Sequence, residues 1–225
     1  MNRSYIICHM MTSVDGRIDC GMTEKLKGVN EYYSTLESLD TPTTVSGRVT
    51  AELEMALPGK FECNNPKPLG SEGFSMKRRA DGYEVIVDTK GTLLWNDDNE
   101  EEKPILIITH ADVSLEYIDY LDCKNISWIA CGHGSVDLNR ACEILYDTFK
   151  IRRMAIVGGG HINGGFLNAG LIDEVSILIG AGIDGREGMT AVFDGLPTDK
   201  EPIPLKLKSI SSFDDGAVWL RYFVC

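Results

Sequence analysis

The chain has 225 residues, and 43% of them are hydrophobic, which is enough to bury the core of one large domain or of two small ones. The net charge of −12 argues against a general nucleic-acid surface, because phosphate backbones would be repelled. No apolar run approaches the roughly 20 residues that cross a bilayer, and the seven scattered cysteines include no C-x-x-C pair. We therefore expect a cytoplasmic protein with reduced thiols, no metal site, and neither a membrane nor a nucleic-acid partner.

The N-terminal part of the chain predicts strands and helices in alternation. Residues Tyr5–Met10 are apolar throughout and indicate a central strand, followed by a turn at Asp15-Gly16. The spacing of apolar residues predicts a helix over Asn30–Leu39, with Asn30 as its N-cap. The apolar face of that helix would hold Tyr32, Tyr33, Leu36 and Leu39. After Pro42, the expected elements are a strand over Thr43–Ser46 and a helix over Thr50–Ala56.

The middle of the chain predicts further strands around a long loop. Residues Pro58–Gly82 show no periodicity, and a loop of that length is usually functional or disordered. The acidic tract Asn96–Glu102 indicates a solvated loop. Three apolar runs predict strands over Glu84–Asp88, Ile105–Thr109 and Ile126–Cys131. Asp137 is the expected N-cap of a helix whose packing stripe is Leu138, Ala141, Cys142, Leu145 and Phe149.

A glycine turn stands at the centre of the next unit. The strand Met154–Val157 is followed at once by Gly158-Gly159-Gly160, and then by a helix over His161–Ala169 that Gly170 ends. A second strand, Val175–Ile179, completes a βαβ unit. A turn of glycines, which have no side chains, exposes N–H groups at the start of a helix, the positive end of the helix dipole. Such a position suits a phosphate. The pattern is not G-x-G-x-x-G and has no acidic ribose partner, so a standard Rossmann site is not indicated.

The C-terminal residues predict a hairpin. The runs Leu205–Phe213 and Ala217–Val224 flank Asp214-Asp215-Gly216, a turn signal. The sheet is therefore expected to be mixed, with a mostly parallel body, flanking helices and an antiparallel C-terminal hairpin. The sequence shows neither an internal repeat nor a linker composition, so residues 1–225 are interpreted as a single α/β domain.

Three motifs in order resemble one family. Ser13–Ile18 (SVDGRI) resembles its S-x-D-G-x-I signature, and Gly47–Thr50 (GRVT) resembles the G-x-x-T after its second strand. Gly158-Gly159-Gly160 followed by Phe166–Glu174 (FLNAGLIDE) resembles its G-G-G…L-x-x-G-L-[IV]-D-E block. The family is the riboflavin-biosynthesis reductases, which share the dihydrofolate reductase-like fold. The H-x-E and C-x-x-C motifs of the separate deaminase domain do not occur in the sequence, so deaminase chemistry is not expected.

The resemblance implies an NADPH-dependent reductase. Its glycine loop would hold the cofactor phosphates, and Arg48 is the candidate for the adenosine 2′-phosphate because its planar fork suits that group. The implied cofactor-binding residues are Gly47, Arg48, Thr50, Thr89, Gly158, Gly159, Gly160, His161, Ile162, Asn163, Gly164 and Gly165. The alternatives are that Thr50 only caps its helix, Thr89 only closes a turn, Arg48 only forms a surface ion pair, and the glycines only make a tight turn.

The same resemblance assigns a substrate side to the N-terminal signature. Ser13, Asp15 and Gly16 would contact the substrate, because a carboxylate accepts hydrogen bonds from ring N–H groups. Asp15 is also the candidate catalytic acid for protonating the product. The alternative is that Asp15 only stabilises its own turn. One departure from the family is Val157, which stands where these reductases place a substrate-contacting Glu, and an apolar side chain cannot accept those hydrogen bonds.

The expected function is a 5-amino-6-(5-phosphoribosylamino)uracil reductase-like activity, with hydride transfer to a C=N or carbonyl carbon of a small heterocycle. Val157 keeps a second hypothesis open, a reductase of a pterin, dihydrofolate or another imine on the same fold. A third hypothesis is a non-catalytic protein that binds NADPH. Relatives in the family are usually dimers, so a homodimer is expected, with the apolar C-terminal strand around Tyr222–Val224 near its interface.

Overall fold

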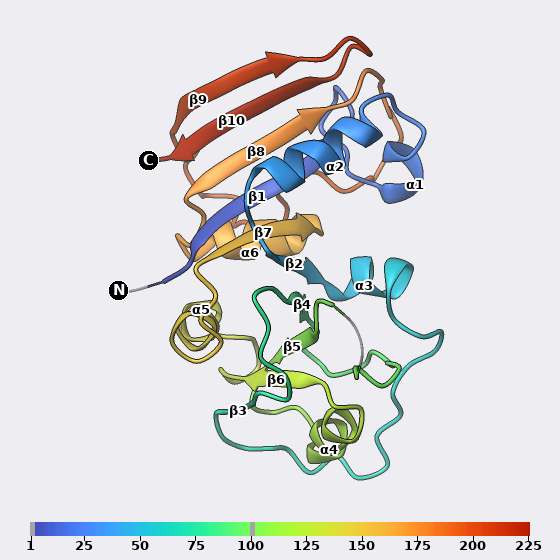
Figure 1. Ribbon diagram of the computed structural model, residues 1–225, viewed down its shortest axis with the longest axis vertical. Helices are drawn as coiled ribbons and strands as arrows, with labels where there is room; N and C mark the ends of the chain where they lie inside the picture. The colour runs from blue at the N-terminus through green and yellow to red at the C-terminus, as the bar shows by residue number, and fades with distance from the viewer. Residues whose placement is uncertain (1–2, 100–101) are drawn as a thin grey trace. The chain divides into compact units, whose positions relative to one another are not determined.

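The computed structural model describes residues 3–99 and 102–225. These residues group into two compact units, which are described in turn (Figure 1). Among the described residues, we call 3–4 with 42–99 and 102–152 the inserted unit, and 5–41 with 153–225 the terminal unit. The interpretation of residues 1–225 as a single domain stays a prediction.

The terminal unit is built on a sheet with the strand order β7-β1-β8-β10-β9. Its strands are β1 (Tyr5–Thr12), β7 (Arg153–Gly158), β8 (Glu174–Ile179), β9 (Leu205–Ser212) and β10 (Val218–Val224). Strand β1 pairs in parallel with both β7 and β8, whereas β10 is antiparallel to β8 and to β9. The predicted hairpin is confirmed, and its turn closes through a hydrogen bond from Gly216 N to Phe213 O.

Helices α1 (Cys20–Thr23), α2 (Val29–Ser38) and α6 (Gly160–Asn168) belong to the same unit. The predicted N-cap Asn30 is wrong, because α2 begins after Gly28, which has a φ of 108°. A Cβ on Gly28 would lie 2.9 Å from the Cβ of Ala217, so the chain enters the helix where only a glycine fits. The predicted apolar face is also wrong at Tyr33, which is 65% exposed.

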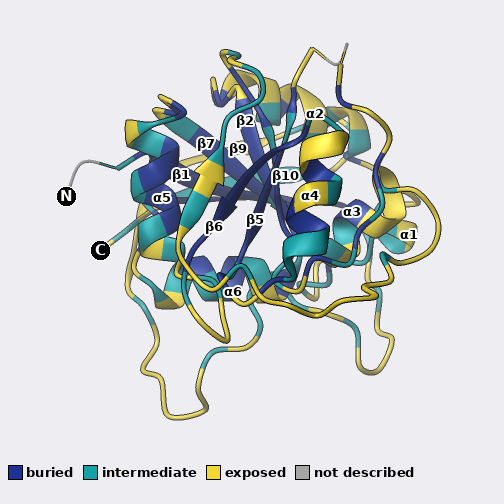
Figure 2. Cartoon of the chain, turned by 90° about the horizontal axis from the view of Figure 1, so that it is seen from below, coloured by how far each residue is buried: buried dark blue, intermediate teal, exposed yellow. Residues whose placement is uncertain are grey.

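The inserted unit has the strand order β3-β6-β5-β4-β2. Its strands are β2 (Thr43–Gly47), β3 (Gly73–Ser75), β4 (Glu84–Val87), β5 (Ile105–Thr109) and β6 (Ser127–Ala130). All pairings are parallel except that of the edge strand β3 with β6. Figure 2 shows β5 and β6 as buried strands, which explains why their sequences are apolar without alternation.

The helices of the inserted unit are α3 (Arg48–Glu54), α4 (Leu115–Cys123) and α5 (Leu138–Asp147). Asp137 caps α5 as predicted, since its carboxylate accepts the N–H of Arg140. Helix α3 begins two residues before the predicted start, after Gly47. The sequence analysis missed α4, although Ser114 is a regular N-cap that accepts the N–H of Tyr117.

Two loop predictions are corrected in this unit. The segment 58–82 is ordered, because Phe61 N donates to Thr92 O, Leu69 N donates to Val113 O, and β3 pairs with β6. The acidic tract is only partly a solvated loop, since Asp98 is 2% exposed and accepts a hydrogen bond from Ile105 N. Residues 100 and 101 of that tract lie outside the described residues.

The predicted fold class is confirmed. The strands form a mostly parallel arrangement with a C-terminal antiparallel hairpin, and helices flank them (Figure 1). Of the helices formed by residues 3–99 and 102–225, none has the length and apolar character that crossing a membrane requires.

Candidate functional site

Three loops of the terminal unit follow neighbouring parallel strands. The loop Ser13–Arg17 follows β1, the glycine turn at Gly158–Gly160 follows β7, and residues from Gly180 onward follow β8. Because β1 pairs in parallel with both β7 and β8, these loops lie at one edge of the sheet. The carboxyl ends of the strands are where open α/β sheets bind ligands.

The glycine turn leaves the start of α6 uncapped. Gly159 is the N-cap residue, with a φ of 89°, and the part of the chain that the structure describes shows no side-chain cap at this position. A Cβ on Gly159 would have only Ile162 Cγ1 nearby, at 3.7 Å, so the turn is open on that side. Uncapped N–H groups at the positive end of a nine-residue helix form a cradle of the kind that holds an anion.

Two other glycines of α6 pack closely against another segment of the chain. We call residues 182–196 the strap. A Cβ on Gly160 would lie 2.4 Å from Ala191 O, and one on Gly164 would lie 1.9 Å from Asp194 O. These two glycines are therefore required for packing against the strap, and their assignment to the cofactor, like that of His161, Ile162, Asn163 and Gly165, stays a prediction.

The loop after β1 is closed by its own hydrogen bonds. Buried Ser13 donates its backbone N–H to Arg17 O, and its Oγ accepts the N–H of Arg17 at 3.1 Å. Gly16 has a φ of 80°, a left-handed conformation that a glycine adopts without strain. The Asp-Gly turn expected from the sequence is thus formed.

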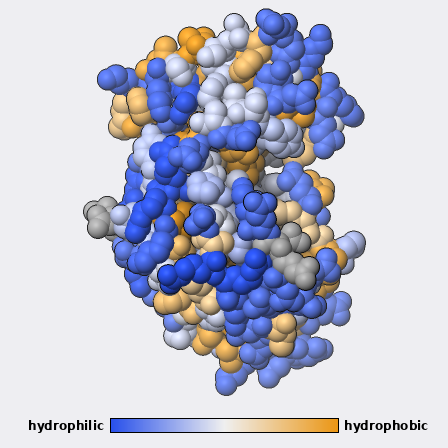
Figure 3. All heavy atoms as spheres, in the orientation of Figure 1, coloured by the Kyte–Doolittle hydropathy of each residue, from blue (hydrophilic) through white to orange (hydrophobic). Residues whose placement is uncertain are grey.

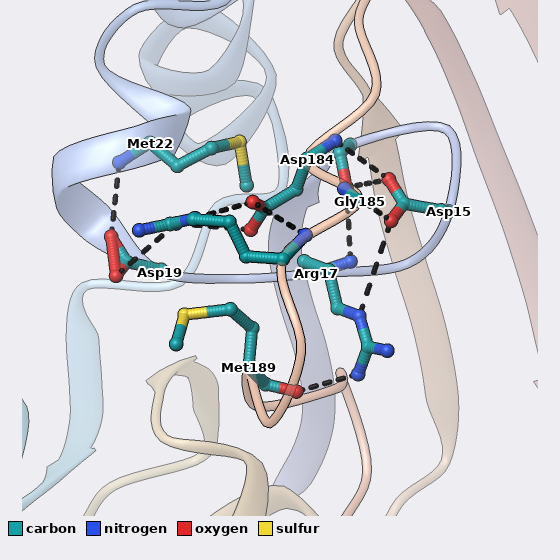
Figure 4. A network of polar contacts seen from close by, with 9 residues as sticks. Asp15, Arg17, Asp19, Met22, Asp184, Gly185 and Met189 are labelled. Atoms are coloured by element: carbon teal, nitrogen blue, oxygen red, sulfur yellow. Dashed lines mark hydrogen bonds and ion pairs between the residues drawn. The ribbon is translucent and has the colours of Figure 1, made fainter.

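Asp15 is held by donors from its own loop and from the strap (Figure 4). Its carboxylate accepts the Ser13 hydroxyl at 2.7 Å, Asp184 N at 2.9 Å and Gly185 N at 3.0 Å. These donors, the Ser13 hydroxyl first among them, hold the pKa of Asp15 far below its usual range. These hydrogen bonds favour the carboxylate form of Asp15. Its predicted roles as a general acid and as a substrate contact both stay predictions.

The sequence analysis missed the partners of this loop. Arg17 donates to Met189 O at 2.5 Å (Figure 4). Arg186 pairs with Asp184 at 2.5 Å and with Asp19 at 3.5 Å. Asp15 and Asp184 are 169 residues apart in the chain, so no local pattern connects them. The available signals were the charge of Arg17, which follows Gly16, and the charge of Arg186, which follows Gly185 of the strap.

The remaining predicted cofactor residues lie in the inserted unit. Gly47 ends β2 and pairs with Val87 at the end of β4, so Arg48, the first residue of α3, and the turn that carries Thr89 follow these strands at one edge of that unit's sheet. Arg48 Nη1 donates to Glu52 at 2.5 Å, the surface ion pair considered as its alternative role. Thr50 lies in the first turn of α3 and is not its N-cap.

Asp88, which follows β4, is a buried carboxylate that the sequence analysis did not single out. It accepts Thr92 N at 2.6 Å and Leu93 N at 2.9 Å, and the hydroxyl of Tyr117 at 3.2 Å. These bonds fix the turn that contains Thr89, whose carbonyl accepts the hydroxyl of Thr109 at 2.9 Å. The position of Thr89 is thus set by the protein itself.

Comparison with known proteins identifies relatives over nearly the whole chain. The family model of the RibD C-terminal domain matches residues 4–219. A pyrimidine reductase-like protein from Corynebacterium diphtheriae aligns with a TM-score of 0.71 and 18% identity, over 99% of this chain and 92% of that one. Riboflavin biosynthesis reductase Rib7 from Saccharomyces cerevisiae aligns with a TM-score of 0.62 and 17% identity, over 99% and 90% of the two chains.

A longer relative from Thermotoga maritima is described as a diaminohydroxyphosphoribosylaminopyrimidine deaminase/5-amino-6-(5-phosphoribosylamino)uracil reductase. It aligns with a TM-score of 0.65 and 16% identity, and the match covers 99% of this chain but 57% of that one. The fold is the dihydrofolate reductase-like fold of the riboflavin-biosynthesis reductases. The chain belongs to the RibD C-terminal domain family.

Proposed function

We propose that this protein is an NADPH-dependent reductase that transfers hydride to a C=N or carbonyl carbon of a small heterocyclic substrate. The substrate that we favour is a ribosylaminopyrimidine phosphate, as named for the Thermotoga relative. The observation that carries the proposal is the uncapped first turn of α6 behind Gly159, because that turn offers N–H groups to a diphosphate. Membership in the family supports the same conclusion.

In this proposal, NADPH supplies the hydride when it is bound, and the chain's residues orient the reactants and exclude water. The first turn of α6 would bind the diphosphate through backbone N–H groups. Arg48 is proposed for the 2′-phosphate, which requires it to exchange Glu52 for the cofactor. Gly47, Thr50 and Thr89 are proposed as further cofactor contacts. Because three hydrogen bonds favour the carboxylate form of Asp15, we propose that water protonates the product nitrogen.

Val157 favours a second candidate substrate class. It is half-buried in β7, directly before the glycine turn, and it cannot accept the hydrogen bonds that a family Glu would accept. The alternative substrate is therefore a pterin, dihydrofolate or another imine that donates no hydrogen bond at the position of Val157. A further alternative is a protein that binds NADPH without turnover.

Binding is tested with two matched variants of α6. Gly159→Asp places a charge and a side chain at the open N-terminal turn, whereas Gly170→Asp places the same group beyond the other end of the helix. Both glycines have positive φ values, 89° and 68°, and no atom within 3.4 Å of the added Cβ, so the two substitutions are comparable in strain. We expect Gly159→Asp to lose NADPH binding in a fluorescence titration and Gly170→Asp to retain it.

Undiminished affinity in Gly159→Asp would remove the glycine turn from the cofactor site. If the unmodified protein gives neither a fluorescence change nor a thermal shift with NADPH, both the reductase and the non-catalytic binding protein are excluded. Binding of NADPH with no oxidation by any substrate of the two classes would favour the non-catalytic protein.

We also propose a homodimer in the cytoplasm. The edge strand β9 and its neighbour β10 expose the apolar side chains Leu205 (44%), Leu207 (53%), Ile210 (63%) and Phe223 (38%). Figure 3 shows apolar atoms at the surface in this part of the terminal unit. Exposed apolar patches on a sheet edge often mark interfaces. Sedimentation of the purified protein gives its mass directly, and a monomer at micromolar concentration would exclude this surface as a stable interface.

A further inference from the structure

The strap connects the loop after β1 with the start of α6. Near its beginning, Val14 N donates to Gly182 O at 2.8 Å, and further along Ile18 N donates to Thr190 O at 3.2 Å. Arg17 adds a side-chain hydrogen bond to Met189 O. Within the described residues, the strap thus follows the loop after β1 over most of the length of both segments.

The far end of the strap is fixed on α6. Asp194 N donates to Gly160 O at 3.0 Å, and Asn163 Nδ2 donates to Val192 O at 2.6 Å. The Asp194 carboxylate closes this end by accepting the N–H of Ala191 at 3.1 Å. Since Gly160 and Gly164 leave no room for a Cβ, this end of the strap and the first turns of α6 pack as one piece.

The near end has a different anchor, the carboxylate of Asp15. Its two oxygens accept the consecutive backbone N–H groups of Asp184 and Gly185, at 2.9 and 3.0 Å (Figure 4). Two successive N–H groups that converge on a carboxylate form the arrangement in which proteins bind anions. Here the anion is a side chain of the same chain. The charged neighbours are Arg17, whose Nε lies 4.0 Å from Asp15, and the Asp184–Arg186–Asp19 group on the strap side.

We propose that Asp15 is a positioning residue, which acts on the reaction by fastening the strap and, through it, the first turn of α6. This inference rests on the proposed reductase function for its effect on turnover, but the fastening itself is a property of the chain alone. Asp15 then contributes through a permanent negative charge and not through a proton. The chemistry explains why an aspartate is suited to this position: two carboxylate oxygens satisfy two N–H groups at once, which a single amide oxygen cannot do equally well.

The hydrogen bonds by which Asp15 holds the strap are tested by hydrogen exchange of the Asp184 and Gly185 amides in the protein without cofactor or substrate. In Asp15→Asn, we expect both amides to exchange about tenfold faster or more, the ratio that follows from losing a hydrogen bond to a charged group. Trypsin should also cleave faster after Arg186, whose side chain is 49% exposed. Glu187→Gln is the matched control, because it removes one negative charge from an exposed position of the strap but keeps Asp15, both amides and the Asp184–Arg186 ion pair.

Turnover separates positioning from proton donation. If Asp15 fastens the strap, Asp15→Asn and Asp15→Ala lower kcat/KM in the order of their exchange rates, while the pH profile keeps its shape because no titrating group is lost. A general acid would instead lose about 10²–10⁴-fold in kcat in both variants alike, together with one limb of the pH profile.

Unchanged amide exchange in Asp15→Asn overturns the proposal, as does loss of a pH limb. A protein that shows the accelerated exchange but oxidises no NADPH with any substrate would defeat the proposed function and leave the fastening of the strap established. The two failures are therefore distinguishable, since the exchange measurement contains neither cofactor nor substrate.

Discussion

Gly164 shows at the scale of one residue how the glycines of α6 divide their roles. A methyl group there would lie 1.9 Å from the carbonyl oxygen of Asp194, which is backbone and cannot move independently. We expect Gly164→Ala to destabilise the protein by about 1–3 kcal/mol, because overpacking outweighs the gain of up to about 1 kcal/mol in helix propensity. Urea unfolding measures the difference, with the exposed Asn168→Ala on the same helix as control. Equal or greater stability in Gly164→Ala would contradict the packing of the strap.

His9 is a buried histidine, and its hydrogen-bond partners determine which ring nitrogen carries the proton in the neutral form. Nε2 lies 3.2 Å from Tyr32 O and is therefore the protonated nitrogen, while Nδ1 accepts from Ser176 Oγ at 2.9 Å. Ser176 in turn accepts the indole N–H of Trp219 at 2.8 Å. Burial, the main cause, lowers the pKa of His9 from 6.5 to about 4.

This lowered pKa predicts a pH dependence of stability. The folded state resists protonation of His9 while the unfolded state accepts it, so the stability present above pH 6.5 is lost as the pH falls toward about 4. When the pH falls from 7 to 5, the lowered pKa of His9 should reduce the free energy of unfolding by about 2 kcal/mol. His9→Gln should not show this reduction. Urea titrations at both pH values provide the measurement. The same pH dependence in both proteins would show that His9 does not control it.

At the residue scale, local turns were predictable from the sequence and their distant partners were not. The sequence indicated a turn at Asp15-Gly16 and a glycine turn at Gly158–Gly160, because both signals are local, while the anion-binding role of the second turn stays a prediction. It could not indicate that Asp15 binds the amides of Asp184 and Gly185, because that contact depends on how distant loops meet at the sheet edge. The role of Gly164 was hidden for the same reason.

At the scale of elements, patterns set by apolar spacing were predictable and boundaries set by contacts were not. The strands other than β3, the hairpin and α5 followed from periodicity and turn residues. The start of α2 depends on the fit of Gly28 against Ala217, a contact between distant segments. The order of the long segment 58–82 likewise depends on hydrogen bonds to Thr92 and Val113, which no local pattern contains.

Glu174 at the start of β8 binds the outer hairpin. Its buried carboxylate accepts from Lys208 on β9 at 2.7 Å and from Arg221 on β10 at 2.5 Å, and the hydroxyl of Tyr5 on β1 lies 3.1 Å away. Burial opposes its ionisation, but the hydrogen bonds from Arg221 and Lys208 outweigh burial and lower its pKa. The single carboxylate of Glu174 on β8 thus contacts side chains from β1, β9 and β10.

We expect Glu174→Gln to destabilise the protein by about 1–3 kcal/mol, since it weakens hydrogen bonds to charged partners that remain partly buried. Thermal unfolding is the measurement, and Glu201→Gln, on the exposed segment before β9, is the control of equal charge. An unchanged melting temperature in Glu174→Gln would show that the hairpin is held by its backbone pairing alone.

At the scale of the whole molecule, the chain belongs to the RibD C-terminal domain family, and its reaction is our proposal. Three short motifs in the right order sufficed to predict the fold, because each one marks a turn that the fold requires at a strand end. The substrate was not predictable in the same way, because Val157 stands where the resemblance implies a substrate-contacting Glu. Relatives at 16–18% identity share the fold and not necessarily the substrate.

The most direct test of the central claim is oxidation of NADPH by the purified protein, followed at 340 nm, as in any assay of reduced nicotinamide. The substrates are the ribosylaminopyrimidine phosphate, dihydrofolate and a simple cyclic imine. We expect oxidation that depends on one of them, most strongly on the ribosylaminopyrimidine phosphate, and that is lost in Gly159→Asp but kept in Gly170→Asp. Absence of oxidation with all three substrates, or equal oxidation by Gly159→Asp, would contradict it.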